Sequence, residues 1–309
     1  MWAVLTLAAI IHATLPHAAG QTSQAAVGPY YGQRLPGSKP GRFLADVAGP
    51  LGIAKAPIFS ADGGEMIWAR STGRHASVLM TSRRERGSWA PPQPVPFSTG
   101  EFFDHNPAMS RDGRRLIFAS NRPIPGKAQT TLPGTDVPAS DLWMSEREGG
   151  AWLPPTALGP PINTGADEDC PVLAADDTLY FSSSRATPTG APGGILRARA
   201  AKGGFTEPER LPAPVSDAGE MVSGIAPDNS YILFYSMKSG EAGGLCLSFR
   251  QADGSWSPPA RLVPLLGGLR PYAASVTMDG RWLLLTVLDS KGAALYWVDS
   301  AILDAARTR

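Results

Sequence analysis

The chain has few of the residues on which several classes of protein depend. Among 309 residues there are two cysteines and four histidines, and the formal net charge is only +1. Cys170 and Cys246 stand too far apart for a disulfide framework or a metal-ligand spacing. We therefore expect two buried free thiols, with a disulfide between them as the alternative. The chain has no long basic stretch, so it offers no electrostatic footprint for nucleic acid or an anionic membrane.

Long apolar runs are also scarce. The run Val4–Ile11 is too short to cross a bilayer and is followed by the small residues Ala18–Gly20. This order predicts a secretory signal peptide over residues 1–20, although the usual basic residues before the apolar run are missing. A buried N-terminal strand is the alternative. No later run is long enough for a membrane helix, so we expect a periplasmic or extracellular protein.

The motifs of familiar enzymes are absent. The sequence contains no Gly-x-Ser-x-Gly elbow, no His-Glu-x-x-His pair, no Walker loop and no dinucleotide fingerprint. Two of the four histidines, His12 and His17, fall within the predicted signal peptide. A Ser-His-Asp hydrolase is therefore not expected.

Glycine and proline are abundant, with 34 and 30 residues, and they separate short apolar runs. This pattern is typical of turns between many short strands. A unit of roughly fifty residues occurs five times, and each copy places an aspartate turn between two apolar runs, which predicts a β-hairpin. The turn aspartates are Asp62, Asp112, Asp176, Asp228 and Asp279. Because they recur once in every copy, we interpret them as turn residues and not as catalytic ones.

Each of the first four copies continues with a third apolar run, an aromatic residue and a proline. The aromatic residues are Trp89, Trp152, Phe205 and Trp256. The prolines, each three positions later, are Pro92, Pro155, Pro208 and Pro259. Proline lacks an N–H donor and is tolerated at sheet edges, so this segment predicts the outer strand of a four-stranded blade. We expect the aromatic side chains to pack between neighbouring blades.

The fifth copy has no outer strand of its own, whereas Pro40–Leu44 has the spacing of an outer strand and no blade. We infer that this segment completes the last blade and closes a ring. The predicted fold is all-β, a β-propeller of five four-stranded blades over residues 40–303, with a lead-in at 21–39 and a C-terminal tail at 304–309. Six blades remain the alternative, if residues 21–50 form most of a further blade.

Two copies carry a more specific pattern. The segments Ser110-Arg-Asp-Gly, then Leu-Ile-Phe-Ala-Ser-Asn-Arg122, and Leu179-Tyr-Phe-Ser-Ser-Ser-Arg185 resemble the WD40-like (PD40) repeat of the TolB type. The resemblance covers residues 28–303 and implies an exported propeller that acts as an interaction scaffold. The same blades also occur beside peptidase domains and in some carbohydrate-active enzymes. TolB has six blades and an extra α/β domain for which this chain has no pattern, so a Tol-system partner is not inferred.

In a propeller, the connections that lead into the inner strands emerge on one face, around the mouth of the central channel, and commonly carry ligand sites. At this position the copies carry three acidic residues: Asp104, Glu168 and Glu220. Neighbouring residues that we assign to the same site are His105, Asp169, Arg270, Tyr272 and Lys55. Loops after the second strands add Arg74, His75, Arg122, Arg185 and Lys238. The long insertion at 123–140 is expected to form a lid over the channel.

Converging carboxylates with flanking cations suit a sugar, a peptide terminus or a divalent cation such as Ca²⁺. We predict a monomeric, non-catalytic binding or protein-interaction scaffold whose ligand is a protein, a peptide or a carbohydrate. No cofactor is expected, and bound Ca²⁺ is the alternative. The second hypothesis is a carbohydrate-active enzyme that uses two of the carboxylates to hydrolyse a glycoside. In a purely structural interpretation, the acidic residues accept hydrogen bonds from inner-strand amides of their own blades, and Arg122 and Asp141 form an ion pair within a blade near the surface.

Overall fold

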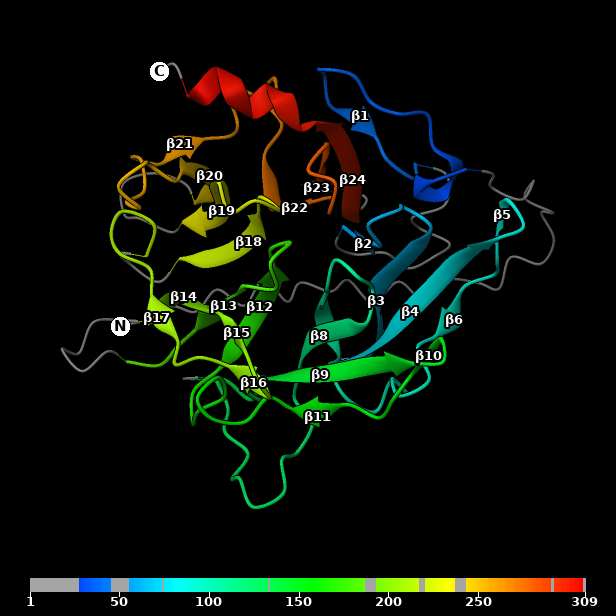
Figure 1. Ribbon diagram of the computed structural model, residues 1–309, viewed down its shortest axis with the longest axis vertical. Coiled ribbons are helices and arrows are strands. Elements are labelled where there is room, and N and C mark those ends of the chain that lie inside the picture. Colours follow the sequence, from blue (N-terminus) through cyan, green and yellow to red (C-terminus); the bar gives the residue numbers. More distant parts are fainter. Residues whose placement is uncertain are drawn as a thin grey trace.

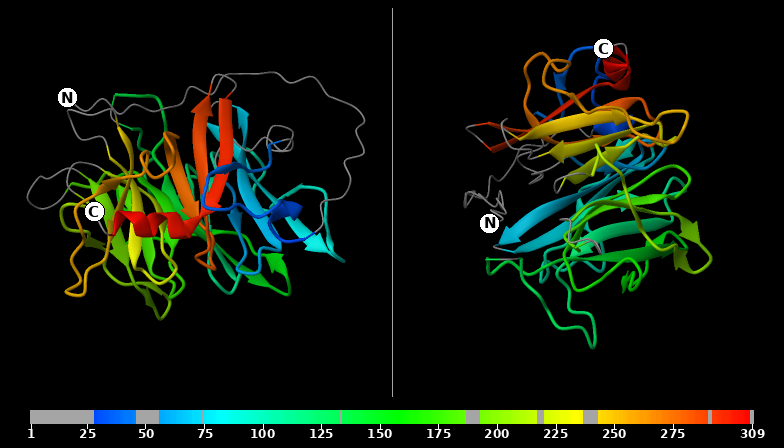
Figure 2. Two further views of the ribbon diagram at one scale, coloured as in Figure 1. Left: turned by 90° about the horizontal axis from the view of Figure 1, so that it is seen from above. Right: turned by 90° about the vertical axis from the view of Figure 1, so that its left-hand side faces the viewer.

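The computed structural model describes residues 28–45, 56–73, 75–132, 134–186, 193–216, 220–236, 243–289 and 292–307. Within them, five small antiparallel sheets form a ring around a central channel, as Figure 1 shows. The predicted five-bladed propeller is therefore confirmed, and the six-blade alternative is wrong. The strands run between two faces of the ring, which Figure 2 shows from the side.

Every blade is an antiparallel sheet whose strands follow one another from the channel outward, with extra short pairings at some outer edges. Blade 1 contains β2 (Ile58–Phe59), β3 (Glu65–Gly73), β4 (Ala76–Glu85), β5 (Ser88–Trp89) and β6 (Gln93–Pro94). Blade 2 contains β7 (His105–Met109), β8 (Arg115–Ser120), β9 (Asp141–Glu148), β10 (Ala151–Trp152) and β11 (Thr156–Ala157). Blade 3 contains β12 (Glu168–Leu173), β13 (Leu179–Ser183), β14 (Gly194–Ala198) and β17 (Glu209–Arg210), with a side hairpin of β15 (Ala200–Ala201) and β16 (Gly204–Phe205).

The remaining blades close the ring. Blade 4 contains β18 (Met221–Ile225), β19 (Tyr231–Ser236), β20 (Gly244–Phe249) and β21 (Ala260–Arg261). Blade 5 contains β22 (Pro271–Val276), β23 (Trp282–Asp289), β24 (Gly292–Asp299) and the N-terminal strand β1 (Gly41–Arg42). Two short 3₁₀ helices, η1 (Tyr30–Gly32) and η2 (Ser300–Ala306), flank the propeller in sequence.

Strand β1 supplies the missing outer strand of blade 5. Gly41 pairs with Trp297 and Arg42 with Tyr296, and the Phe43 amide donates to the Leu295 carbonyl at 2.9 Å. In Figure 1, β1 (blue) accordingly lies beside β24 (dark red). In all five blades an outer strand begins at the residue after a proline, in the order β6, β11, β17, β21 and β1. The edge role predicted from proline chemistry is confirmed.

The hairpin turns between first and second strands are built identically. In each blade the Oδ1 atom of the turn aspartate accepts the backbone N–H two residues ahead at 3.0 Å. This bond fixes the turn locally, so the second strand leaves in the direction opposite to the first. The turn-making role predicted for the five aspartates is confirmed.

The core consists of five apolar clusters, one at each interface between neighbouring blades. The cluster between blades 5 and 1 also contains Tyr30, Phe43 and Leu44 from the N-terminal segment. Trp89, Trp152 and Trp256 are buried in these clusters, and Phe205 packs against one while remaining partly exposed. Packing between blades is therefore the main apolar contribution to stability, as predicted for the aromatic residues.

The inner strands β7, β12, β18 and β22 each contain a β-bulge, where the register with the second strand shifts. Beyond the bulges, apolar residues of all five inner strands line a narrow channel cavity of about 60 Å³. A cavity of this volume has room for a few water molecules but not for a sugar or peptide. A sugar or peptide therefore cannot bind inside the channel, although it can bind at the mouth of the channel.

Candidate functional site

The three predicted carboxylates lie at the mouth, where the inner strands begin, but their side chains are buried. The exposed fraction is 0% for Asp104 and Glu168 and 2% for Glu220. A buried carboxylate requires compensating donors. What surrounds each side chain therefore decides whether it can reach a ligand.

Asp104 is surrounded by donors from its own blade and the preceding loop. Its Oδ1 accepts from the Ser120 hydroxyl at 2.7 Å and from Arg122 Nε at 3.0 Å. Its Oδ2 accepts from the Ser98 hydroxyl and from Arg122 Nη2, both at 2.6 Å. Arg122 also donates to the Phe97 carbonyl and lies over the Phe102 ring at 5.0 Å. Asp104 thus joins the strands of blade 2 and is saturated by internal bonds.

Glu168 repeats the arrangement in blade 3. Its carboxylate accepts from the Thr164 amide and hydroxyl, at 2.9 and 2.7 Å, and from the Ser183 hydroxyl at 2.9 Å. Arg185 Nη2 lies 3.3 Å from Oε1 and also donates to the Ile162 carbonyl. Asp104 and Glu168 are therefore bonded within their own blades, as the structural interpretation predicts, but the donors are hydroxyls, arginines and the Thr164 amide and not amides of the inner strands.

The predicted pair of Arg122 with Asp141 does not form. Arg122 pairs with Asp104, while Asp141 receives Lys127 Nζ at 2.5 and 2.7 Å. Lys127 belongs to the insertion at 123–140, in which Thr131 bridges to Pro138. These contacts fold the described part of the insertion on itself, and Figure 1 shows it projecting past β11 and not over the middle of the ring. The lid prediction is therefore wrong.

Partly exposed polar groups gather at the mouth where blade 2 meets blade 3. His105 Nε2 lies 3.2 Å from Asp169 Oδ1, and the Asn106 amide donates to the same oxygen at 2.8 Å. The exposed fraction of the side chain is 13% for His105 and 27% for Asp169. The ring of His105 also stacks on Phe103, with centroids 4.2 Å apart. We call His105, Asn106, Asp167, Asp169 and Cys170 the mouth cluster; Asp167 precedes β12 and interacts electrostatically with both His105 and Asp169.

The backbone of the mouth cluster is strained at two positions. Asn106 and Cys170 occupy the β-bulges of β7 and β12 with φ values of 47° and 52°. Left-handed backbone is uncommon for residues other than glycine, and asparagine tolerates it better than cysteine. The Asn106 amide reaches Cys170 Sγ at 3.5 Å, so the two bulges contact each other across the blade interface.

The pKa values of His105 and Asp167 in the mouth cluster are both raised above their ordinary values. Burial alone would lower the pKa of His105, but the Asp169 carboxylate and the Phe103 carbonyl raise it above its ordinary value. Both ring nitrogens have an acceptor, and only the imidazolium donates to both. Burial, then the like charge of Asp169, raises the pKa of Asp167 from 3.8 to about 7. The cluster can therefore hold or release a proton near neutral pH.

The other predicted site residues are dispersed around the same mouth. Tyr272 lies in the bulge of β22 and is partly buried, which raises the pKa of its hydroxyl to about 12. Arg270 is exposed just before β22. His75 lies in the described part of the loop between β3 and β4. Lys55, Arg74, Lys238 and the signal segment 1–20 fall outside the described residues.

Neither a metal-ligand cluster nor a membrane-spanning helix occurs among the described residues. Across the described ranges, no three His, Cys, Asp or Glu side chains gather in a way that could hold a metal ion. Cys170 and Cys246 are free thiols, and only Cys246 is fully buried. No helix in the described part of the chain has the length and apolarity needed to cross a membrane.

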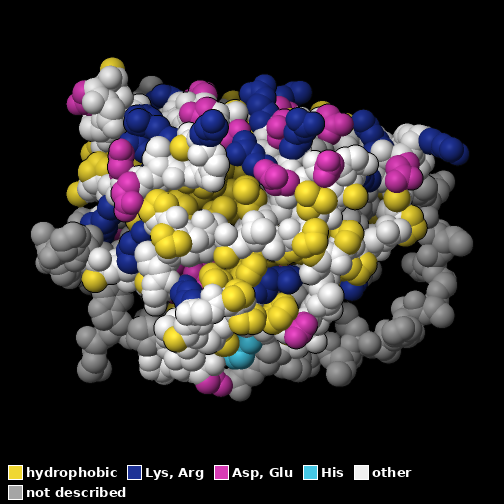
Figure 3. Space-filling model, turned by 60° about the horizontal axis from the view of Figure 1, so that its bottom comes forward, with side chains coloured by type: hydrophobic (Ala, Val, Ile, Leu, Met, Phe, Trp, Pro, Cys, Tyr) yellow, Lys and Arg dark blue, Asp and Glu magenta, His cyan; other side chains and the backbone are white. Residues whose placement is uncertain are grey.

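The surface charges of the described residues are mixed. Figure 3 shows one side of the ring, with hydrophobic side chains across its middle and basic and acidic side chains interspersed near its upper edge. Interspersed charges of both signs produce no extended field of a single sign on this side. This agrees with the net charge of +1.

No protein-family model and no curated protein matches the chain. Solved propellers are similar to it in fold. TolB from Acinetobacter baumannii is 13% identical, with a TM-score of 0.49 over 79% of this chain and 51% of that one. A gluconolactonase from Xanthomonas campestris is 15% identical, with a TM-score of 0.45 over 89% and 88%. The β-propeller domain of the Trilobed protease from Pyrococcus furiosus is 11% identical, with a TM-score of 0.42 over 79% and 68%.

The likeness to these proteins concerns the fold alone. This chain spans about half the length of the TolB structure, and their identities to it are low. The resemblance to TolB-type propellers inferred from the repeat is confirmed at that level. The named proteins include a lactonase and a protease, so the shared fold does not select an activity.

The sequence prediction missed three members of the mouth cluster: Asn106, Cys170 and Asp167. A signal was present for two of them, because Asn106 and Cys170 each precede the proline that opens the repeat, at equivalent positions in neighbouring blades. Asp167 directly precedes the buried Glu168 in the sequence. Only the fold shows that the Glu168 carboxylate is turned into the blade, whereas the Asp167 carboxylate lies beside His105.

Proposed function

We propose that this propeller is a non-catalytic binding scaffold that holds a polar ligand, a peptide or a carbohydrate, at the channel mouth between blades 2 and 3. One observation carries the proposal. At the same mouth, Asp104 and Glu168 are buried and saturated by internal hydrogen bonds, whereas the His105–Asp169 pair is partly exposed. The polar groups that a ligand can reach belong to the mouth cluster, which bridges two blades, and not to the carboxylates that are saturated within single blades.

Burial of the recurring carboxylates argues against a glycoside hydrolase that uses them as catalytic groups. Glycoside hydrolysis requires two carboxyl groups in contact with the sugar, one on each side of the scissile bond. Asp104 and Glu168 have no exposed surface, and each is paired with an arginine of its own blade. Freeing either of them would leave a partly buried guanidinium without its counter-charge.

The mouth cluster has the properties of a binding site. It offers an imidazole, an amide and a carboxylate on two inner strands that are fixed by sheet pairing on one side and blade packing on the other. Rigid elements hold polar groups with less loss of conformational entropy on binding. Because the channel beyond is narrow and apolar, the ligand contacts the rim and does not pass through.

A carbohydrate-active enzyme remains the second candidate, because one observation favours it. Asp167 has a pKa of about 7, and Asp169 is a neighbouring carboxylate that contributes to this shift. A carboxylic acid that keeps its proton near neutral pH beside an ionised one is the arrangement used for general acid and base roles. In this chain such chemistry would require Asp167 and Asp169, not Asp104 and Glu168.

Thermal stabilisation and product analysis together test the proposal. The protein is screened with cello-, xylo- and chito-oligosaccharides and with tripeptides, and affinity for any stabilising probe is measured by isothermal titration calorimetry. We expect D169N and H105Q to weaken binding by about tenfold each, as the loss of a charged hydrogen bond does. E101Q removes an exposed carboxylate from the preceding loop and is the matched control.

The outcomes separate the two candidates. Binding that depends on Asp169, without any product by chromatography, supports the scaffold. Cleavage of an oligosaccharide that is lost in both D167N and D169N supports the enzyme and overturns the scaffold. If no probe stabilises the protein, or if D169N binds like E101Q, the mouth cluster is not the binding site.

The predicted signal peptide supports the proposal that this scaffold is exported to the periplasm or out of the cell. Sequencing the N-terminus of the protein recovered from those compartments tests that part of the proposal. A mature chain that begins after about residue 20 supports export. An intact N-terminus in the cytoplasm contradicts it.

A further inference from the structure

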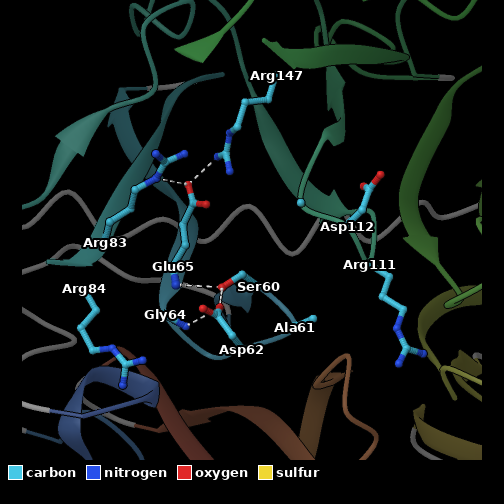
Figure 4. Close-up of a pocket in the computed structure, with 11 residues that line it drawn as sticks. Ser60, Ala61, Asp62, Gly64, Glu65, Arg83, Arg84, Arg111, Asp112 and Arg147 are labelled. Atoms are coloured by element: carbon cyan, nitrogen blue, oxygen red, sulfur yellow. Dashed lines mark hydrogen bonds and ion pairs between the residues drawn. The ribbon is translucent and has the colours of Figure 1, made fainter. Parts of the chain in front are cut away.

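A second polar cavity lies on the opposite face of the ring, where the hairpin turns of blades 1 and 2 meet. Its volume is about 430 Å³, within the range of small-molecule sites. The turn residues 60–64 and 111–113 and the ends of β4 and β9 line it, as Figure 4 shows. Inner strands run from the mouth cluster to these turns, so the two sites lie at opposite ends of the blades.

Four arginines line this cavity, and two of them share one carboxylate. Arg83 Nε lies 3.1 Å and Arg147 Nη2 2.7 Å from the same oxygen, Oε1 of Glu65. The Thr81 hydroxyl also donates to that oxygen, at 3.2 Å. One carboxylate between two guanidinium groups leaves an excess of one positive charge.

Arg147 is held rigidly with donor capacity to spare. Its guanidinium carbon lies 3.8 Å from the centroid of the Trp152 ring, and its side chain is only 15% exposed. Its Nε is buried and has no hydrogen-bond partner within the described residues. A buried donor without an acceptor is costly, so an incoming anion at this position gains a hydrogen bond that the protein alone does not supply.

Arg84 and Arg111 flank the cavity, and their guanidinium groups have hydrogen-bond donors to spare. Neither side chain forms a hydrogen bond or an ion pair with any residue in the described ranges. In Figure 4 they stand on opposite sides of the Asp62 turn, with their guanidinium groups directed away from Glu65. Two separated guanidinium groups can each bind one anionic group in a bidentate manner.

The remaining acidic residues of the cavity are used by the turns. Oδ1 of Asp62 accepts from the Ser60 hydroxyl and the Gly64 amide, and Oδ1 of Asp112 accepts from the Ser110 hydroxyl and the Arg114 amide. The three acidic side chains oppose four arginines, so the lining retains a positive charge. The acidic groups are already engaged, whereas two of the arginines are not.

We propose that this cavity binds a small anion that carries two or more carboxylate or phosphate groups. The guanidinium groups of Arg84, Arg111 and Arg147 supply the positive charge and the hydrogen-bond donors that such a ligand needs. The size of the cavity admits an acidic sugar or a polycarboxylate, and the fork of each guanidinium matches either kind of oxyanion. The site is independent of the mouth cluster.

Calorimetric titration of the full-length protein with citrate and with pyrophosphate at low salt tests the proposal. We expect a single site with a Kd below about 1 mM for at least one probe, weakening as chloride is added. The double variant R84Q/R111Q should bind about tenfold or more weakly, because each fork–oxyanion contact is lost. K202Q/R250Q removes two exposed charges from blades 3 and 4 and should bind like wild type.

A variant that is expected to bind more tightly is also needed, because weaker binding alone could result from loss of folding. D112N keeps the oxygen that accepts the turn bonds but removes a negative charge from the lining, so binding should tighten by about twofold or more. Binding of citrate but not of pyrophosphate identifies a carboxylate ligand, and binding of pyrophosphate but not of citrate identifies a phosphate ligand. If neither probe binds, or if R84Q/R111Q binds like K202Q/R250Q, the proposal is overturned.

Discussion

Replacing Asp167 by asparagine tests the electrostatics of the mouth cluster directly. The Asp167 Oδ1 atom accepts the Ser140 amide at 2.8 Å, and an asparagine oxygen can keep that bond while the charge is removed. In the native chain, burial and the like charge of Asp169 raise the pKa of Asp167 from 3.8 to about 7. The substitution therefore removes an ionisation that opposes folding at neutral pH.

The sign follows from proton linkage. Between about pH 4 and pH 7 the folded protein holds a proton on Asp167 that the unfolded chain releases, so the free energy of unfolding falls as the pH rises. A shift of about three pKa units corresponds to at most about 4 kcal/mol, present in full below about pH 4 and lost as the pH rises through about 7. The raised pKa of His105 acts in the same direction, and it is itself raised in part by Asp167.

The measurement is urea unfolding at several values between about pH 5 and about pH 8, followed by tryptophan fluorescence. Wild type should lose roughly 2–4 kcal/mol over this interval, and D167N should lose less than about half as much. D167N should therefore be the more stable protein at about pH 8. E101Q, an exposed carboxylate variant, should follow wild type. Parallel profiles for D167N and wild type would refute the reasoning.

Two further predictions concern the ring itself. Replacing Phe43, which is 1% exposed beside β1, by alanine should lower the free energy of unfolding by about 3–5 kcal/mol. Replacing Leu35, which is 48% exposed, by alanine should change it little in the same urea series. D104N should cost about 3–5 kcal/mol, because it removes the charge of a fully buried carboxylate that pairs with the partly buried Arg122, while E101Q in the same loop should be neutral. Equal stability of D104N and E101Q would mean that Asp104 is not part of the scaffold.

The architecture was predictable because its signals are local and repeated. An aspartate that accepts the amide two residues ahead makes a turn without help from distant residues, and a proline at a blade edge needs only the absence of its N–H. Ring closure was predictable by complementarity, since one blade lacked an outer strand and Pro40–Leu44 lacked a blade. The structure pairs these two segments at Gly41 and Trp297.

The site was predicted only as a location, because the fate of a carboxylate depends on residues distant in sequence. Asp104 is buried by Ser98, Ser120 and Arg122, which come from a loop, a strand end and a second loop. Nothing in the spacing of the acidic residues distinguishes this arrangement from an open ring of carboxylates. The pair of His105 with Asp169 forms only when two blades pack together.

Recurrence itself separates structural residues from candidate ligand contacts in this propeller. A side chain repeated in several blades, such as Asp104 and its equivalent Glu168, can perform the same internal task in each of them. Within the part of the chain that the structure describes, the bond between His105 and Asp169 has no counterpart at another interface, and neither has the sharing of Glu65 by Arg83 and Arg147. The second strands of blades 2 to 5 begin with Arg115, Leu179, Tyr231 and Trp282 where blade 1 has Glu65. A ligand that is not itself five-fold symmetric needs contacts that break the symmetry of the ring, and the two proposed sites are places where this chain breaks it.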